Sequence, residues 1–317
     1  MIAVYELSNG SVRRIDLTEW GPVPPADGAI RWARAVGAED QEFLALLGAL
    51  GLPSEDVVEL LDRDVQARVV AHPQSLVAVM PLLGGDTGPA DVLRLACTPA
   101  LLATWEPRAL PGLDRTVDEL GAASGRDVSV AAVVVDLLEA AVDGGGATYL
   151  ALRHELEDLA EAIERNPVGI EPAVLLAMKR RVTRLFTAWE GQSYCLIQIK
   201  RRRSHVSESR GAREQLRDLV SDANLGLKLL AHLEARVRDL RLHHAHCLQE
   251  SANRRLNLLA ILSAVYLPAT LIAGIYGMNF ERIPMTHLTH GYLAVMTLMG
   301  IVVVGQWWYF RRRGWFE

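Results

Sequence analysis

Cysteine is scarce in this chain: three occur among 317 residues, at positions 97, 195 and 247. They are too few and too scattered for a disulfide framework, so we expect a reducing compartment. The formal net charge of −5 is the wrong sign for a nucleic-acid-binding protein, and we expect no nucleic-acid partner. The first segment, MIAVYELSNGS, lacks the basic and apolar regions of a secretory signal, so any membrane insertion must come from within the chain.

Several catalytic motifs are also missing. The sequence contains no GxxxxGK[ST], no HExxH and no GxSxG, and His154-Glu155 has no second histidine at the required spacing. Nucleotide hydrolysis, zinc-dependent proteolysis and serine hydrolysis therefore have no support in the sequence. We expect a protein that is not an enzyme and carries no cofactor.

What the chain does have is concentrated hydrophobicity: half of its residues are hydrophobic and 22% are charged. Residues 256–276 and 292–310 contain no charge, and as helices each is long enough to cross a hydrocarbon core of about 30 Å. Buried core helices are the alternative, but uninterrupted apolar runs of this length flanked by arginines argue against it. We predict a transmembrane hairpin.

The arginines predict its orientation. Arg254 and Arg255 precede the first run and three arginines follow the second, whereas the connecting loop carries only Glu281 and Arg282, which cancel. The positive-inside rule places both termini in the cytoplasm and the loop outside. The part of the chain before the hairpin then carries a net charge of −7 and is cytoplasmic.

One side of the first run is small and polar. Steps of alternately three and four residues from Asn253 give the stripe Leu256, Ala260, Ser263, Leu267, Thr270, Gly274 and Gly277. Such a stripe indicates either close helix–helix packing or a surface that faces water inside a bundle. Because one hairpin cannot enclose a pore, the second interpretation requires an oligomer.

The end of the first run carries a recognisable motif. Its sequence PATLIAGIYGMNFERIP is followed by Gly291-Tyr292, the second run and the tail RRRGWFE. This arrangement resembles the CorA family of divalent-cation transporters, whose signature is a Gly-Met-Asn triplet at the end of the first of two C-terminal spans. The resemblance is close over about residues 250–317 and looser over the rest.

The resemblance implies a fold and a function. The fold is an α/β cytoplasmic domain, a long stalk helix and two C-terminal transmembrane helices in a homopentamer with a central pore. The implied cargo is a divalent metal cation: Mg²⁺ is the leading expectation, and Co²⁺ and Ni²⁺ are further ones. The same kind of ion would also regulate the transporter, and the implied location is the inner (plasma) membrane. The selectivity filter would be Gly277, Met278 and Asn279; the pore lining would be Asn253, Leu256, Ser263, Leu267, Thr270 and Gly274; and Glu281 would attract cations at the outer mouth.

The rest of the chain divides by pattern. Residues 1–120 alternate seven strand-like runs with helical patterns at 39–50 and 54–63, which predicts an α/β domain. Residues 121–255 are helical, with a break at Gly144–Gly146, antiparallel helices at 148–165 and 172–203, and a stalk helix at 212–255. The further segments expected are 256–276 (first span), 277–291 (outer loop), 292–310 (second span) and 311–317 (basic tail).

The stalk has a seven-residue pattern. Its apolar positions are Leu216, Ala223, Leu230 and Val237, joined by Leu219, Leu233 and Leu240. This pattern is typical of a coiled-coil seam and predicts self-association. Asp218 lies on the first turns, where the resemblance implies a regulatory metal site; a solvated helix face is the alternative.

Metal-ligating side chains flank the spans. His243 and Cys247 are four residues apart on one helical face, a spacing that can hold a borderline metal ion. His287 and His290 stand outside, where the magnesium-type relatives tend to be acidic. Two alternatives therefore stay open. One is a zinc transporter like the ZntB branch or a poorly selective cation transporter, with or without proton coupling, and the other is a membrane-tethered metal sensor that transports nothing.

Overall fold

A computed structural model of the chain describes residues 1–8, 11–22, 28–62, 66–82, 91–122, 128–278 and 290–313. The chain separates into two units. The first consists of Met1–Glu161 with Glu171–Leu240, and the second of Ala162–Ile170 with Arg241–Glu317.

The first unit is built on a seven-stranded sheet in the order β2-β1-β3-β7-β6-β5-β4. The strands are β1 (Ile2–Ser8), β2 (Ser11–Ile15), β3 (Ile30–Val36), β4 (Arg68–His72), β5 (Ser75–Pro81), β6 (Val92–Cys97) and β7 (Leu101–Glu106). All neighbouring pairs are antiparallel except β3 and β7, which are parallel. The seven strands predicted from the sequence are confirmed.

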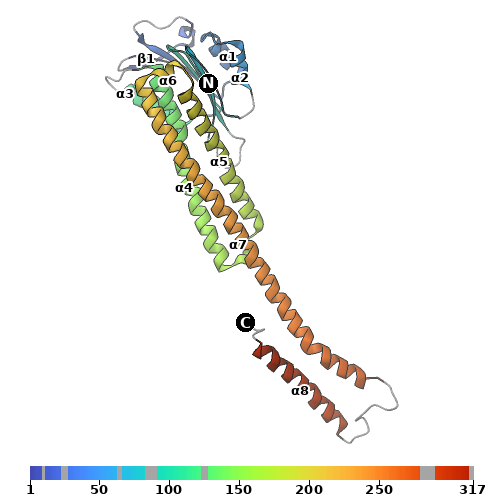
Figure 1. Cartoon of the computed structure of the whole chain (residues 1–317). Helices are drawn as coiled ribbons and strands as arrows, with labels where there is room; N and C mark the ends of the chain where they lie inside the picture. The colour runs from blue at the N-terminus through green and yellow to red at the C-terminus, as the bar shows by residue number, and fades with distance from the viewer. Residues whose placement is uncertain are drawn as a thin grey trace. The chain divides into compact units, whose positions relative to one another are not determined.

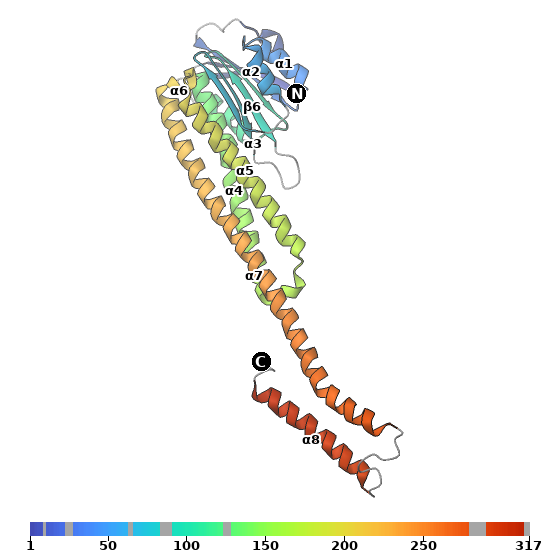
Figure 2. The ribbon, with the colours of Figure 1, turned by 45° about the vertical axis from the view of Figure 1, so that its right-hand side comes forward.

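Both faces of this sheet are covered (Figures 1 and 2). Helices α1 (Asp40–Gly48) and α2 (Ser54–Leu61) pack on one face, where Val77 and Val79 of β5 point. Leu76 and Met80 of the same strand point to the opposite face and join the core formed with the long helices. Burial on both sides explains why β5 is continuously apolar rather than alternating.

The long helices follow the sheet in the chain. They are α3 (Pro111–Ala122), α4 (Val130–Arg165), α5 (Pro172–Arg201), the short α6 (His205–Glu208) and α7 (Arg210–Tyr276). The described residues also include the short 3-10 helices η1 (Leu17–Glu19) and η3 (Pro167–Gly169). The expected break at Gly144–Gly146 is wrong, because α4 runs through these glycines. Each glycine costs a helix only about 1 kcal/mol, and Leu138 and Leu152 on either side are buried in the core.

The apolar face that the seven-residue pattern marks on the stalk helix packs against a different partner from the one expected. Leu216, Ala223, Leu230 and Val237 are buried within the single chain, in one core cluster with residues of α4 and α5. This face is therefore occupied by intrachain packing, and the prediction that it forms a self-association seam is wrong. The pattern shows that one helical face is apolar, but not which helix covers it.

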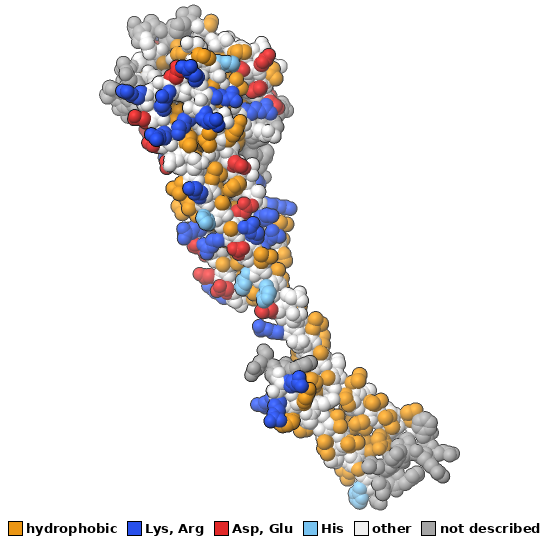
Figure 3. Space-filling model, in the orientation of Figure 1, with side chains coloured by type: hydrophobic (Ala, Val, Ile, Leu, Met, Phe, Trp, Pro, Cys, Tyr) orange, Lys and Arg blue, Asp and Glu red, His pale blue; other side chains and the backbone are white. Residues whose placement is uncertain are grey.

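The second unit contains the last part of α7 and helix α8 (Gly291–Arg312). Both helices are long and apolar enough to cross a membrane. Their apolar side chains lie on the outside (Figure 3). The α7 helix continues without interruption through Pro268 to Tyr276.

Candidate ion conduit and metal-ligand cluster

One face of the last part of α7 has reduced exposure. Its half-buried or buried residues are Ile261, Ala264, Val265, Pro268, Ala269, Ile272 and Tyr276. Helix α8 has a similar series at Gly291, Val295, Met299, Val302, Val303, Gln306 and Phe310. Each series repeats every three or four residues, so each marks one helical face. These two faces are the ones the hairpin covers by itself.

The small and polar stripe lies on the other side of α7. Asn253, Leu256, Ser263, Leu267, Thr270 and Gly274 are all exposed in the single chain, and so is Gly277. An open groove of about 590 Å³ follows the stripe and is lined by Ser263, Tyr266, Leu267, Thr270, Leu271, Gly274, Ile275 and Met278. The hairpin leaves this face without an intrachain cover.

Two polar groups on the stripe are paired locally. The Thr270 hydroxyl donates to the Tyr266 carbonyl oxygen at 2.9 Å, and its own oxygen keeps the capacity to accept a hydrogen bond. The Asn253 carboxamide oxygen accepts from the Gln249 amide at 3.2 Å. Sequence reasoning missed Tyr266, Leu271 and Ile275 as lining residues, because they stand one position beside the alternating stripe.

The end of α7 carries the first part of the triplet. The Gly277 N–H donates to the Ala273 carbonyl at 2.9 Å, and Met278 is half exposed just after it. Asn279 and Glu281 lie outside the described residues, as does His287. Of the three predicted filter residues, the structure therefore describes Gly277 and Met278, which directly follow Tyr276, the last residue of α7.

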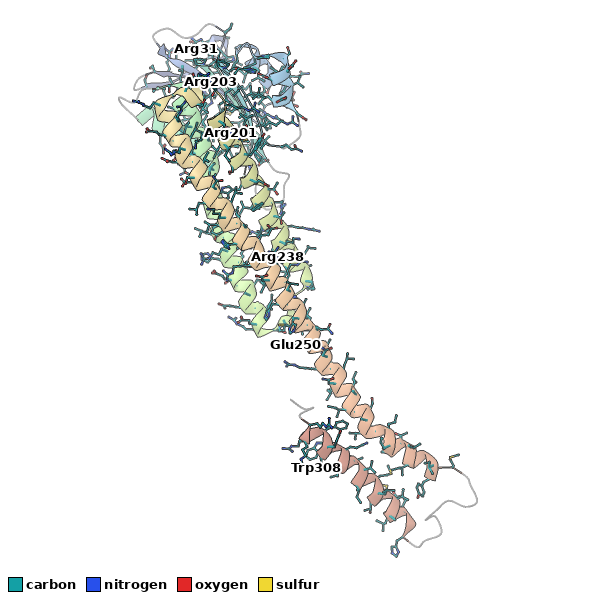
Figure 4. The ribbon with its side chains drawn as sticks, in the orientation of Figure 1. Arg31, Arg201, Arg203, Arg238, Glu250 and Trp308 are labelled. Atoms are coloured by element: carbon teal, nitrogen blue, oxygen red, sulfur yellow. The ribbon has the colours of Figure 1, made fainter. Side chains whose placement is uncertain are left out.

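The segment of α7 before the stripe holds the side chains of metal-ligating types. Cys247 Sγ lies 3.6 Å from His243 Nε2, and His246 Nδ1 lies 3.6 Å from Glu250 Oε1 on the same helix (Figure 4 labels Glu250). His244 points elsewhere: it is buried, and its Nε2 lies 2.8 Å from the Pro167 carbonyl oxygen.

Asp218 is exposed on α7, as the solvated alternative expects. Among the residues that the structure describes, no group of three or more His, Cys, Asp or Glu side chains is placed to hold a metal ion. A metal ion at Asp218 would therefore have fewer than three of these side chains from the described part of its own chain.

A run of aromatic residues is followed by three arginines at the end of α8. Arg311, Arg312 and Arg313 each lie over the aromatic ring four residues earlier, at 5.2, 4.8 and 5.3 Å from the ring centroids of Trp307, Trp308 and Tyr309. Figure 4 labels Trp308 at this end of the helix. Aromatic rings beside arginines are typical of a membrane–water interface, here on the side that the positive-inside rule calls cytoplasmic.

Curated proteins of known sequence are similar to the chain, among them the following two. The magnesium transport protein CorA of Escherichia coli (strain K12) is 24% identical over 325 residues, which covers 99% of this chain and all of that protein. The putative metal ion transporter YfjQ of Bacillus subtilis (strain 168) is 35% identical over 116 residues, but the match spans only 36% of this chain and 35% of that protein.

Solved structures share the fold, among them two of different branches. The CorA magnesium transporter of Methanocaldococcus jannaschii has a TM-score of 0.84 at 18% identity and covers 99% of this chain and 98% of its own. The ZntB cytoplasmic domain of Vibrio parahaemolyticus has a TM-score of 0.65 at 12% identity and covers 78% of this chain and 98% of its own.

The family model described as CorA-like Mg²⁺ transporter protein matches residues 27–312, nearly the whole chain. That family consists of membrane transporters and not of enzymes, in agreement with the absence of catalytic motifs from the sequence. The chain belongs to the CorA-like Mg²⁺ transporter family.

Proposed function

We propose that this protein carries Mg²⁺ across the inner (plasma) membrane through the central pore of a homopentamer, with Co²⁺ and Ni²⁺ as further substrates. The observation that carries the proposal is the stripe from Asn253 to Gly277, which is small or polar at most positions, exposed and uncovered by the hairpin. A polar face in lipid needs a partner, and five copies around an axis would supply one.

In this arrangement the stripe residues line the conduit. Ser263 and Thr270 present hydroxyl oxygens to the conduit. Gly274 has no side chain that would narrow it, and Leu256 and Leu267 form apolar constrictions. Gly277, Met278 and Asn279 form the outer filter, and Glu281 raises the local cation concentration there. Mg²⁺ gives up its water reluctantly, so neutral amide and backbone oxygens can hold the hydrated ion and still release it.

The membrane potential is the driving force in this proposal. It supplies about 2.3 kcal/mol per charge per 100 mV, hence about 4.6 kcal/mol for a divalent ion, and it favours uptake. With both termini cytoplasmic, the acidic part before the hairpin receives the entering ions.

A zinc transporter like the ZntB branch is the second candidate. The observation that favours it is the presence of soft and borderline ligands beside the membrane: His243 and Cys247 in contact, with His290 at the start of α8. Proton coupling would belong to this alternative.

The test is flux into proteoliposomes with an inside-negative potential. Mg²⁺, Co²⁺, Ni²⁺ and Zn²⁺ are presented separately, and Asn279→Ala is the filter variant. Voltage-driven Mg²⁺ entry that loses selectivity in Asn279→Ala supports the proposal. Entry confined to Zn²⁺, or dependent on a pH gradient, supports the alternative. If the protein assembles but gives no ion flux above that of empty liposomes, the result supports the membrane-tethered metal sensor instead.

A further inference from the structure

Metal-ligating side chains crowd one short stretch of α7. Residues 243–250 read HHAHCLQE and include three of the nine histidines and one of the three cysteines. At 100° per residue, His243, His246, Cys247 and Glu250 share one side of the helix. His243, His246 and Glu250 are exposed and Cys247 is half-buried, so a solvated cation can reach them.

The contact between Cys247 and His243 has the dimensions of a metal site. Zinc binds thiolate at about 2.3 Å and imidazole nitrogen at about 2.0–2.1 Å, and these bonds at a tetrahedral angle place the two donor atoms about 3.5 Å apart. The observed distance between Cys247 Sγ and His243 Nε2 is 3.6 Å. One cation could therefore touch both atoms with the helix backbone unchanged.

The other two cysteines are unavailable for such a role. Cys97 and Cys195 are buried, and burial raises the pKa of both thiols, so neither is deprotonated at neutral pH. Cys97 also lies 3.7 Å from a histidine nitrogen, His205 Nε2, but inside the core of the first unit. Cys247 is the thiol of this chain that a metal ion in solution can reach.

We infer that His243 and Cys247 form a binding site for a borderline transition-metal cation, of the Zn²⁺, Ni²⁺ or Co²⁺ class, on the cytoplasmic segment of α7. When the cation binds, the Cys247 thiol releases its proton to solvent and a metal–sulfur bond forms. Within one chain the site supplies two protein ligands, and water completes the coordination. The second pair, His246 and Glu250, lies on the same side one turn along.

The position of this site connects it to transport. Cys247 precedes Asn253 by six residues, about 9 Å along a helix. A bound divalent ion minus one proton leaves a net charge of +1 beside the cytoplasmic end of the stripe. This step rests on the proposed function: positive charge there opposes the exit of Mg²⁺, so we expect Zn²⁺ on the cytoplasmic side to slow Mg²⁺ flux.

The binding test uses the purified full-length protein in detergent, with Co²⁺ as the probe. A Co²⁺–thiolate bond gives a near-ultraviolet charge-transfer band, which we expect to saturate at one Co²⁺ per chain and to disappear when Zn²⁺ displaces it. Cys247→Ser should abolish the band, and His243→Gln should weaken Co²⁺ binding by at least about tenfold. The control His154→Gln removes an exposed histidine of α4 and should change nothing.

Two outcomes would overturn the inference: no band in the unsubstituted protein at millimolar Co²⁺, or a band that persists in Cys247→Ser. The flux experiment separates this inference from the proposed function. If Asn279→Ala keeps normal selectivity, the filter proposal fails while Co²⁺ binding is unaffected. If Zn²⁺ slows Mg²⁺ flux equally in the unsubstituted protein and in Cys247→Ser, the regulatory role is wrong.

Discussion

The indole ring of Trp189 on α5 lies directly against the backbone of Gly226 on α7. A Cβ atom added at residue 226 would stand 2.3 Å from Trp189 Cζ2 and 2.4 Å from Cε2. No side chain larger than hydrogen fits there unless the ring moves. Gly226, which interrupts the apolar pattern of the stalk in the sequence, is therefore a packing requirement of the first unit.

We expect Gly226→Ala to destabilise the protein although alanine is the better helix former. Overpacking against a rigid ring costs about 1–3 kcal/mol, more than the 0.5–1 kcal/mol that alanine gains in a helix. Gly211→Ala in the same helix is the matched control, because a Cβ there meets nothing within 4 Å. Thermal unfolding should show a lower Tm for Gly226→Ala and an equal or higher Tm for Gly211→Ala. Equal Tm values for the two variants would contradict this packing argument.

The guanidinium of Arg34 on β3 pairs with two carboxylates, one at the end of β7 and one on α3. Arg34 pairs with Glu106, whose side chain is fully buried, and with Asp114. Burial raises the pKa of the Glu106 carboxyl even though Arg34 opposes the shift. Arg34→Met leaves that carboxyl without its cation and should cost about 3–5 kcal/mol.

The exposed pair Arg203–Glu208 provides the control for this prediction. Its side chains are 90% and 53% exposed, so Arg203→Met should change stability little. Denaturant unfolding of both variants in the same detergent measures the difference. An Arg34→Met variant as stable as Arg203→Met would show that the buried pair contributes nothing.

His205 predicts a loss of stability in acid. Burial lowers the pKa of this histidine below its ordinary value of 6.5. As the pH falls through 6.5, the unfolded chain binds a proton that the folded chain binds only at lower pH, so stability is present above the unfolded pKa and decreases toward the folded one. His205→Gln should therefore lose less Tm than the unsubstituted protein between pH 7.5 and pH 5.5. The exposed His154→Gln should keep the full loss, and an identical loss in His205→Gln would assign the effect to another group.

Two neighbouring faces of α7 predict different responses to added bulk. Ser263 lies in the stripe and Leu262 is an exposed neighbour about 100° away on the helix. If the stripe lines the conduit, Ser263→Phe should remove most of the Mg²⁺ flux in proteoliposomes, whereas Leu262→Phe should retain it. Equal flux in both variants, with equal amounts of assembled protein, would place the conduit on another face.

Local pattern was enough to predict the strands, the first two helices and the paired apolar helices. It could not predict the sheet order or the parallel pairing of β3 with β7, because strand pairing depends on contacts between distant segments. The same limit explains the stalk: periodicity identified Leu216 and Leu230 as one apolar face, but the helices that cover it come from elsewhere in the chain.

The metal-ligating cluster shows a similar division. The spacing of His243 and Cys247 predicted that the two side chains could meet, since residues four apart share a helical face. Spacing alone could not predict that His244 is buried whereas His243 and His246 are exposed. Its burial against the Pro167 carbonyl depends on the loop between α4 and α5, which no local pattern of α7 contains.

Because α7 is one unbroken helix, it restricts the lengths of insertions and deletions that the chain can tolerate there. Val265 and Ile272, on the face that the hairpin covers, each stand two residues before a residue of the open stripe, Leu267 and Gly274 respectively. An offset of two turns a side chain by about 200°, so the covered face and the open stripe are opposite sides of one continuous helix. Inserting one residue before Asn253 would rotate the stripe by about 100° about the helix axis relative to the helix residues just before the insertion. Only insertions or deletions of about seven residues keep both faces in place, so natural variants of this segment should differ in length by whole heptads.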